Sequence, residues 1–190
     1  MIENLWSTPF LKTKMPDELR VNFLNKIFTD YDLANPPRDF SSLNIFNNMS
    51  KEVLEFRNEV VMPAFDQFLE KSLGKKISDW KSNETHGWIT GTGRDYSLNF
   101  HNHRGSQLSA VFYLLCEEQD RGGVITFTDP RMNANRGYDP AFIPWFEPKV
   151  IIPKSGDIVV FPSFLYHFVT TYQSNIRVAV PVDLFLRTNK

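Results

Sequence analysis

The chain has 190 residues, of which 42% are hydrophobic and 14% aromatic, and its formal net charge at pH 7 is -1. This length and apolar content fit one globular domain with a sizeable core and exclude a disordered chain. The charge gives no strong nucleic-acid signature, and the single cysteine, Cys116, excludes an internal disulfide and a cysteine-rich zinc site.

The N-terminal stretch MIENLWSTPFLKTKM lacks the basic start and apolar run of a signal peptide. No stretch of about 18 uncharged apolar residues occurs in the sequence. We therefore expect no membrane partner, a reducing compartment and a cytoplasmic protein.

The first part of the chain predicts two amphipathic helices. In residues 16–31, Pro16 suits the first helical position and apolar residues recur on one face. A second helix is expected to start at the N-cap Ser50 and to stop at Gly74, with a kink at Pro63 because proline removes one backbone donor.

After Lys76 the pattern changes to short runs rich in β-branched and aromatic residues, each bounded by turn residues. About eight such strands fit a sandwich, a jelly roll or a barrel, with the helices packed outside. We expect a single domain over residues 1–190, with helical support over 1–76 and a β core over 77–190. The runs are GWITGT, YSLNFHN, LSAVFYLLC, GGVITFTD, KVIIP, DIVVFPS, YHFVTTY and IRVAVPVDLFL.

Three of the four histidines form a candidate metal site. His101 and His103 stand two residues apart in FHNHRGS, so on a strand both imidazoles point to the same side. Structural or surface histidines would explain this pair equally well. His167 follows an apolar strand and a proline turn, and a third histidine there is what a facial metal site needs. His86, in the polar SNETHGW, is interpreted as a loop residue.

Three other polar residues are candidates. Asp129, at the end of GGVITFTD, is either a turn former before proline or a carboxylate that completes the site. Arg177 is a cation in the apolar run SNIRVAVPV, which is costly unless it binds an anion or reaches solvent at a sheet edge. Tyr113, in AVFYLL, either fills the core or uses its hydroxyl.

Taken in order, these motifs resemble the double-stranded β-helix core of the iron(II)- and 2-oxoglutarate-dependent dioxygenase superfamily. They are most similar to a small 2OG-Fe(II) oxygenase subgroup found in bacteria and cyanophages. The motifs that carry the resemblance are HNHRGSQLSAVFYL, FTDPR and GDIVVFPSFLYHFV, with LWSTPF near the N-terminus. The implied fold is mainly β with flanking helices: a double-stranded β-helix, or cupin-like jelly roll, with an N-terminal helical layer.

The superfamily motif is HxD, a distant histidine, and an Arg or Lys some ten residues later. Carried over, His101 and His167 match the two histidines, Arg177 matches the cation that binds the distal carboxylate of 2-oxoglutarate, and Tyr113 matches a tyrosine that reaches the cosubstrate. His103 stands where the superfamily has Asp. Either three histidines bind the metal or Asp129 supplies the carboxylate. A second departure is Ala179, where the subgroup usually has Ser.

The resemblance implies an enzyme that binds Fe(II) and uses 2-oxoglutarate as cosubstrate, hydroxylating a substrate with release of succinate and CO2. One alternative is a cupin-like, non-catalytic binding protein, for which Arg177 would have no use. Another is a three-histidine dioxygenase that does not use 2-oxoglutarate.

The long connection of residues 131–148, RMNANRGYDPAFIPWFEP, is a candidate lid over the site. Its candidate binding residues are Arg131, Arg136, Tyr138 and Trp145, and the substrate would be a peptide, a nucleotide or a small metabolite. The oligomeric state is left open.

Overall fold

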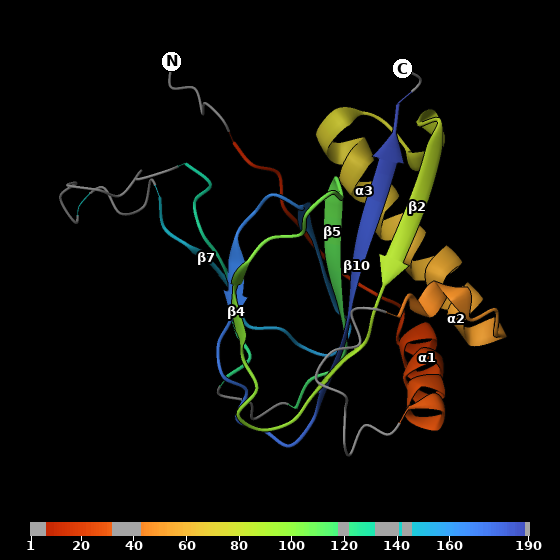
Figure 1. Ribbon diagram of the computed structural model, residues 1–190, viewed down its shortest axis with the longest axis vertical. Coiled ribbons are helices and arrows are strands. Elements are labelled where there is room, and N and C mark those ends of the chain that lie inside the picture. The colour runs from red at the N-terminus through yellow and green to blue at the C-terminus, as the bar shows by residue number, and fades with distance from the viewer. Residues whose placement is uncertain (1–6, 32–42, 118–121, 132–140, 142–145, 189–190) are drawn as a thin grey trace.

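In a computed structural model, two antiparallel sheets face each other, and helices cover the outer face of the larger one (Figure 1). The structure describes residues 7–31, 43–117, 122–131, 141 and 146–188. This arrangement confirms the expected jelly roll with an N-terminal helical layer. Among the described residues, no helix has the length and apolar character needed to cross a bilayer.

The larger sheet has six strands and carries the helices. Five of them lie in the order β1-β8-β5-β10-β2, and β3 pairs with β10 beside β2. Their bounds are β1 Leu11–Lys14, β2 Ser82–Gly87, β3 Thr90–Thr92, β5 Leu108–Leu115, β8 Asp157–Pro162 and β10 Arg177–Arg187. Because helices cover one face and the smaller sheet the other, β5 is buried along almost its whole length, which explains its continuous apolar run.

The smaller sheet has four strands in the order β4-β9-β6-β7. Their bounds are β4 Leu98–His101, β6 Ile125–Phe127, β7 Lys149–Ile151 and β9 His167–Val169. Strand β6, which lies in GGVITFTD, is the neighbour of β9, because Phe127 of β6 pairs with His167 of β9.

The helices follow the predicted pattern with one irregularity. Helix α1 spans Asp17–Asp30, and the second helical segment runs as α2 (Lys51–Glu55), a π-helix (Phe56–Val61) and α3 (Met62–Leu73). The π-helical turns stand directly before Pro63, whose missing N–H cannot bond in the α-helical pattern. Gly74 ends α3 in the left-handed conformation with φ of 64°, as glycine does at helix C-termini. Short 3-10 turns occupy Ile45–Asn47 (η1) and Ile77–Asp79 (η3).

The alternation of side chains along β10 separates two cores. Val178, Val180 and Val182 pack with the helices, whereas Ala179 packs in the second core, between the sheets. Arg177 and Asp183 are each an even number of residues from Ala179, so they lie on this inner face. The strand therefore presents two charged residues to the space between the sheets.

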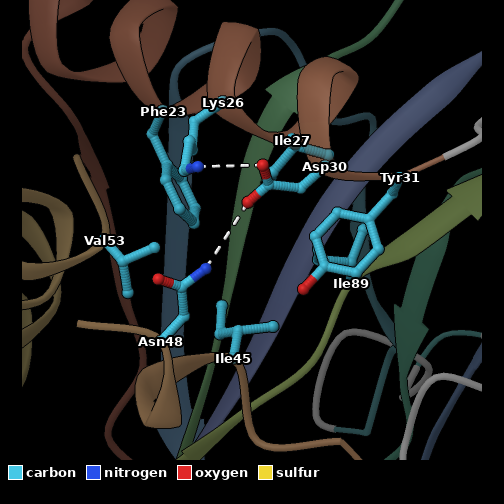
Figure 2. Close-up of a pocket in the computed structure, with 9 residues that line it drawn as sticks. All are labelled: Phe23, Lys26, Ile27, Asp30, Tyr31, Ile45, Asn48, Val53 and Ile89. Atoms are coloured by element: carbon cyan, nitrogen blue, oxygen red, sulfur yellow. Dashed lines mark hydrogen bonds and ion pairs between the residues drawn. The ribbon is translucent and has the colours of Figure 1, made fainter. Parts of the chain in front are cut away.

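A small pocket lies on the helical side of the larger sheet (Figure 2). The carboxylate of Asp30 accepts hydrogen bonds from Lys26 Nζ at 2.8 Å and from Asn48 Nδ2 at 3.4 Å. Ile27 and Ile89, which line the pocket, belong to the helix-facing core. The pocket therefore lies apart from the space between the sheets.

Candidate functional site

Three imidazoles lie close together at the ends of two neighbouring strands of the smaller sheet and in the segment after β4. His101 ends β4 and His167 begins β9, and the two form a cross-strand pair whose ring centroids lie 4.3 Å apart. His103 follows β4 and is held beside them by a backbone hydrogen bond from its N–H to Ser163 O at 3.0 Å. One nitrogen from each ring lies within 4.8 Å of the others, a spacing that could hold a metal ion.

Each of the three rings has its Nδ1 engaged by an oxygen acceptor. Nδ1 of His101 lies 2.6 Å from Asn99 O, Nδ1 of His167 lies 3.0 Å from Leu165 O, and Nδ1 of His103 lies 2.9 Å from Asp183 Oδ1. A carbonyl or carboxylate oxygen only accepts, so Nδ1 carries the proton in each ring. This tautomer leaves three Nε2 lone pairs, which are the ligand atoms that a transition metal requires.

Burial keeps two of these imidazoles neutral. It lowers the pKa of His167 to about 3, and the same desolvation lowers the pKa of His101. The rings of Phe127 and Phe161 lie 5.2 and 5.1 Å from that of His167, between centroids, and shield it from solvent. A neutral, shielded histidine is suited to metal coordination.

Asp129 lies at the end of the expected strand, but its carboxylate faces another residue. It is ion-paired with Arg131 and also accepts a hydrogen bond from the Arg131 backbone N–H at 2.8 Å. The side-chain hydrogen bond from Arg131 holds the pKa of Asp129 below its usual value. The metal-binding group formed by described residues contains the three histidines and not Asp129.

Arg177 and Tyr113 form a second polar site between the sheets. The side chain of Arg177 is buried, with Nη1 donating to Gly123 O at 2.6 Å and Cζ lying 5.1 Å from the centre of the Tyr113 ring. Tyr113 is fully buried, and its hydroxyl has no hydrogen-bond partner among the described residues. Burial raises the pKa of Tyr113 to about 12, so the phenol stays protonated and can donate. A buried cation beside an orphaned hydroxyl fits a carboxylate ligand.

Asp183, the hydrogen-bond partner of His103, was not among the residues predicted from the sequence. The signal was present, because Asp183 is a charged residue in an apolar strand and lies on the same strand face as Arg177. His86 was placed wrongly: it lies on β2 and pairs with Asp183 across the sheet. Ala179, where the subgroup usually has Ser, packs in the core between the sheets.

The candidate lid falls mostly outside the described residues. Of its candidate binding residues, Arg136, Tyr138 and Trp145 lie outside that range, and Arg131 is the one whose contacts are described.

A family model described as "Putative 2OG-Fe(II) oxygenase" matches residues 86–183, which include the three histidines, Tyr113, Arg177 and Asp183. No curated protein sequence gives a significant match.

Solved structures share the fold at low sequence identity. A prolyl-4-hydroxylase from Pseudomonas putida superposes with a TM-score of 0.61 at 16% identity, covering 98% of this chain and 96% of that one. The viral collagen prolyl hydroxylase vCPH from Paramecium Bursaria Chlorella virus-1, solved as a 2OG complex, gives 0.57 at 13% identity over 95% and 96% of the two chains.

A 2OG-Fe(II) oxygenase family oxidoreductase from Burkholderia pseudomallei gives a TM-score of 0.51 at 16% identity. The match covers 73% of this chain and 59% of the Burkholderia chain, so the chain spans less than two thirds of that protein.

Proposed function

The chain belongs to the 2OG-Fe(II) oxygenase family, and from this premise we propose that it hydroxylates a substrate, with release of succinate and CO2. As a member of the family it is an enzyme that uses iron and 2-oxoglutarate. In such a reaction one atom of O2 enters the succinate, the other becomes the substrate hydroxyl, and CO2 leaves the 2-oxoglutarate.

We assign the metal to His101, His103 and His167. The support is chemical as well as geometric, because three imidazoles whose Nδ1 atoms are engaged and whose Nε2 atoms are free form a facial set that suits iron and leaves coordination positions open. Asp129 is assigned to no metal role, since its carboxylate is paired with Arg131. The apolar rings of Phe127 and Phe161 limit water around the centre.

Arg177 and Tyr113 are assigned to the distal carboxylate of 2-oxoglutarate. The observation that carries the proposal is the buried guanidinium beside a buried hydroxyl without a hydrogen-bond partner. Arg177 would neutralise the carboxylate and Tyr113 would donate its O–H to it. A non-catalytic, cupin-like protein would need neither group.

The all-histidine ligand set favours one second candidate, a three-histidine dioxygenase that uses no cosubstrate. Anaerobic titration separates the two functions. Fe(II) is added first and 2-oxoglutarate second, and the visible charge-transfer band of the iron chelate is recorded. A band that saturates with 2-oxoglutarate supports the proposal. Iron binding without a band favours the second candidate, and absence of iron binding contradicts both.

A further inference from the structure

The carboxylate of Asp183 lies directly behind one of the proposed ligands. Its Oδ1 is 2.9 Å from His103 Nδ1, and both side chains are largely buried, with 13% and 8% exposed. Asp183 is not part of the group of ligand atoms itself. Its hydrogen bond to the three-histidine group is the one to His103.

His103 differs from the other two histidines in the charge of its acceptor. His101 and His167 donate to neutral backbone carbonyls, whereas His103 donates to a carboxylate. Hydrogen bonds to charged acceptors are about twice as strong as those to neutral ones. His103 also stands at the position where the superfamily motif has Asp. The ligand set thus lacks an anion, and an anion lies one hydrogen bond further out.

A network of buried hydroxyls holds the Asp183 carboxylate in place. Ser109, its cross-strand neighbour on β5, donates to Asp183 Oδ1 at 2.6 Å. The Ser109 hydroxyl in turn lies 2.8 Å from that of Ser163, which accepts from Ser106 at 2.8 Å. Ser109 and Ser163 are 0% and 1% exposed. A carboxylate fixed in this way cannot leave His103 without breaking buried hydrogen bonds.

We infer that Asp183 is a positioning residue of the metal centre. It holds the His103 ring with Nδ1 protonated and Nε2 free for the metal, and it supplies through that ring the negative charge that an Asp ligand would bring. This inference rests on the proposed function, since it assumes that His103 binds the metal.

Cobalt(II) binding to the purified full chain tests the inference without turnover. Two variants are compared, Asp183→Asn, which keeps the shape and an acceptor oxygen, and Asp183→Ala, which keeps neither. Loss of an outer partner of a ligand costs about 10- to 100-fold in metal affinity. We expect the cobalt affinity of Asp183→Ala to be reduced by a factor in that range and the cobalt affinity of Asp183→Asn to be reduced less.

Asp157→Asn is the matched control. Asp157 is also a buried carboxylate, 1% exposed, but it pairs with Lys12 and Lys14 at the opposite end of β8 from Ser163. Its substitution should change cobalt affinity by less than about twofold, the scale expected where no ligand or outer partner is lost. Circular dichroism confirms that each variant is folded, and the isosteric Asn variant keeps the test valid if the Ala variant unfolds.

Proton NMR of the cobalt protein supplies a readout that a purely structural role would not move. The shifted Nδ1–H signal of His103 is identified by its absence in His103→Ala. It should exchange faster with solvent in Asp183→Ala than in wild type.

Wild-type affinity and an unchanged signal in both Asp183 variants would overturn the inference and leave the oxygenase proposal standing. Failure of the wild type to bind cobalt would overturn both.

Discussion

The guanidinium of Arg177 lies against the ring of Tyr113, with Cζ 5.1 Å from the ring centroid. The two residues come from neighbouring strands, since Ala179 of β10 pairs with Tyr113 of β5. Gly123 O fixes one guanidinium nitrogen, and an arginine has five N–H donors. The remaining donors and the Tyr113 hydroxyl form a polar site inside an otherwise apolar core.

Removal of the guanidinium should weaken 2-oxoglutarate binding and spare the metal. A charge-assisted contact of this kind is worth roughly 2 to 5 kcal/mol on truncation, so affinity in Arg177→Ala should fall by about 30-fold or more. Arg177→Lys should lose less affinity, because lysine keeps the positive charge but lacks the planar guanidinium with its several N–H donors. Calorimetry on the metal-loaded variants measures the affinity. Wild-type affinity in a folded Arg177→Ala protein would remove the cosubstrate role.

Tyr113→Phe should affect folding and binding in opposite directions. The hydroxyl is buried without a hydrogen-bond partner, so its removal should leave the free energy of unfolding of the apoprotein unchanged or raise it by about 1 kcal/mol. Binding of 2-oxoglutarate should weaken by about 3- to 10-fold, the value of one hydrogen bond. Denaturant melts and calorimetry measure the two quantities. A destabilised apoprotein with unchanged binding would mean that the hydroxyl is purely structural.

Four single substitutions test the metal assignment. His101→Ala and His167→Ala should lose metal affinity by more than about 100-fold, since loss of a ligand costs more than loss of an outer partner. His103→Ala should weaken binding substantially. Asp129→Ala should change it by less than about threefold, because Arg131 already holds that carboxylate and no outer partner is lost. Metal content and cobalt titration decide, and full occupancy in His167→Ala would refute the assignment.

Much of this architecture could be predicted because β5, β8 and β10 are buried on both faces over most of their length, which gives long apolar runs bounded by turn residues. Strands β1 and β2 could not be predicted in this way. They lie at the two ends of the strand order of the larger sheet, and their sequences, LKTK and SNETHG, contain no apolar run.

Side-chain partners were harder to predict than strands. The pairing of Asp129 with Arg131 depends on a local turn, and that of Asp183 with His103 joins elements 80 residues apart in sequence. Hydrophobic periodicity reports which face of a strand is buried and carries no information about which polar groups meet.

Asp157 should give the protein an acid-sensitive contribution to stability. Burial acts to raise the pKa of its carboxyl, but hydrogen bonds from Lys14, from the Lys154 backbone N–H and from Lys12 outweigh burial, so the pKa lies below the usual 3.8. A carboxyl whose pKa is lower in the folded than in the unfolded state stabilises the fold at pH values above its unfolded-state pKa. This contribution is lost as the pH falls through the folded-state pKa. The free energy of unfolding of wild type should therefore exceed that of Asp157→Asn by about 2 kcal/mol at pH 7. This difference should close as the pH falls below about 4. Denaturant melts at several pH values measure the gap, and a constant gap would contradict the assignment.

Gly122 should be intolerant of any side chain, because the chain there touches a neighbouring backbone. A Cβ at this position would lie 1.8 Å from the carbonyl oxygen of Thr171. The next residue, Gly123, has φ of 67°, donates its N–H to Thr170 O at 3.2 Å and accepts from Arg177 Nη1 at 2.6 Å. The two glycines therefore join the start of the β6 segment to the residues after β9 and to the proposed cosubstrate site.

Gly122→Ala should move this segment away from Thr171 and so break the hydrogen bond from Arg177 Nη1 to the Gly123 carbonyl. We expect a loss of about 2 to 4 kcal/mol in the free energy of unfolding, as for other overpacked sites, together with weaker 2-oxoglutarate binding. Cobalt affinity should stay nearly unchanged, since the three histidines lie on other segments. Gly93→Ala is the control, because a Cβ there would meet Asn175 O at an ordinary 3.7 Å. If Gly122→Ala matched this control in thermal melts and in 2-oxoglutarate calorimetry, Gly123 would not be needed to hold Arg177 in place.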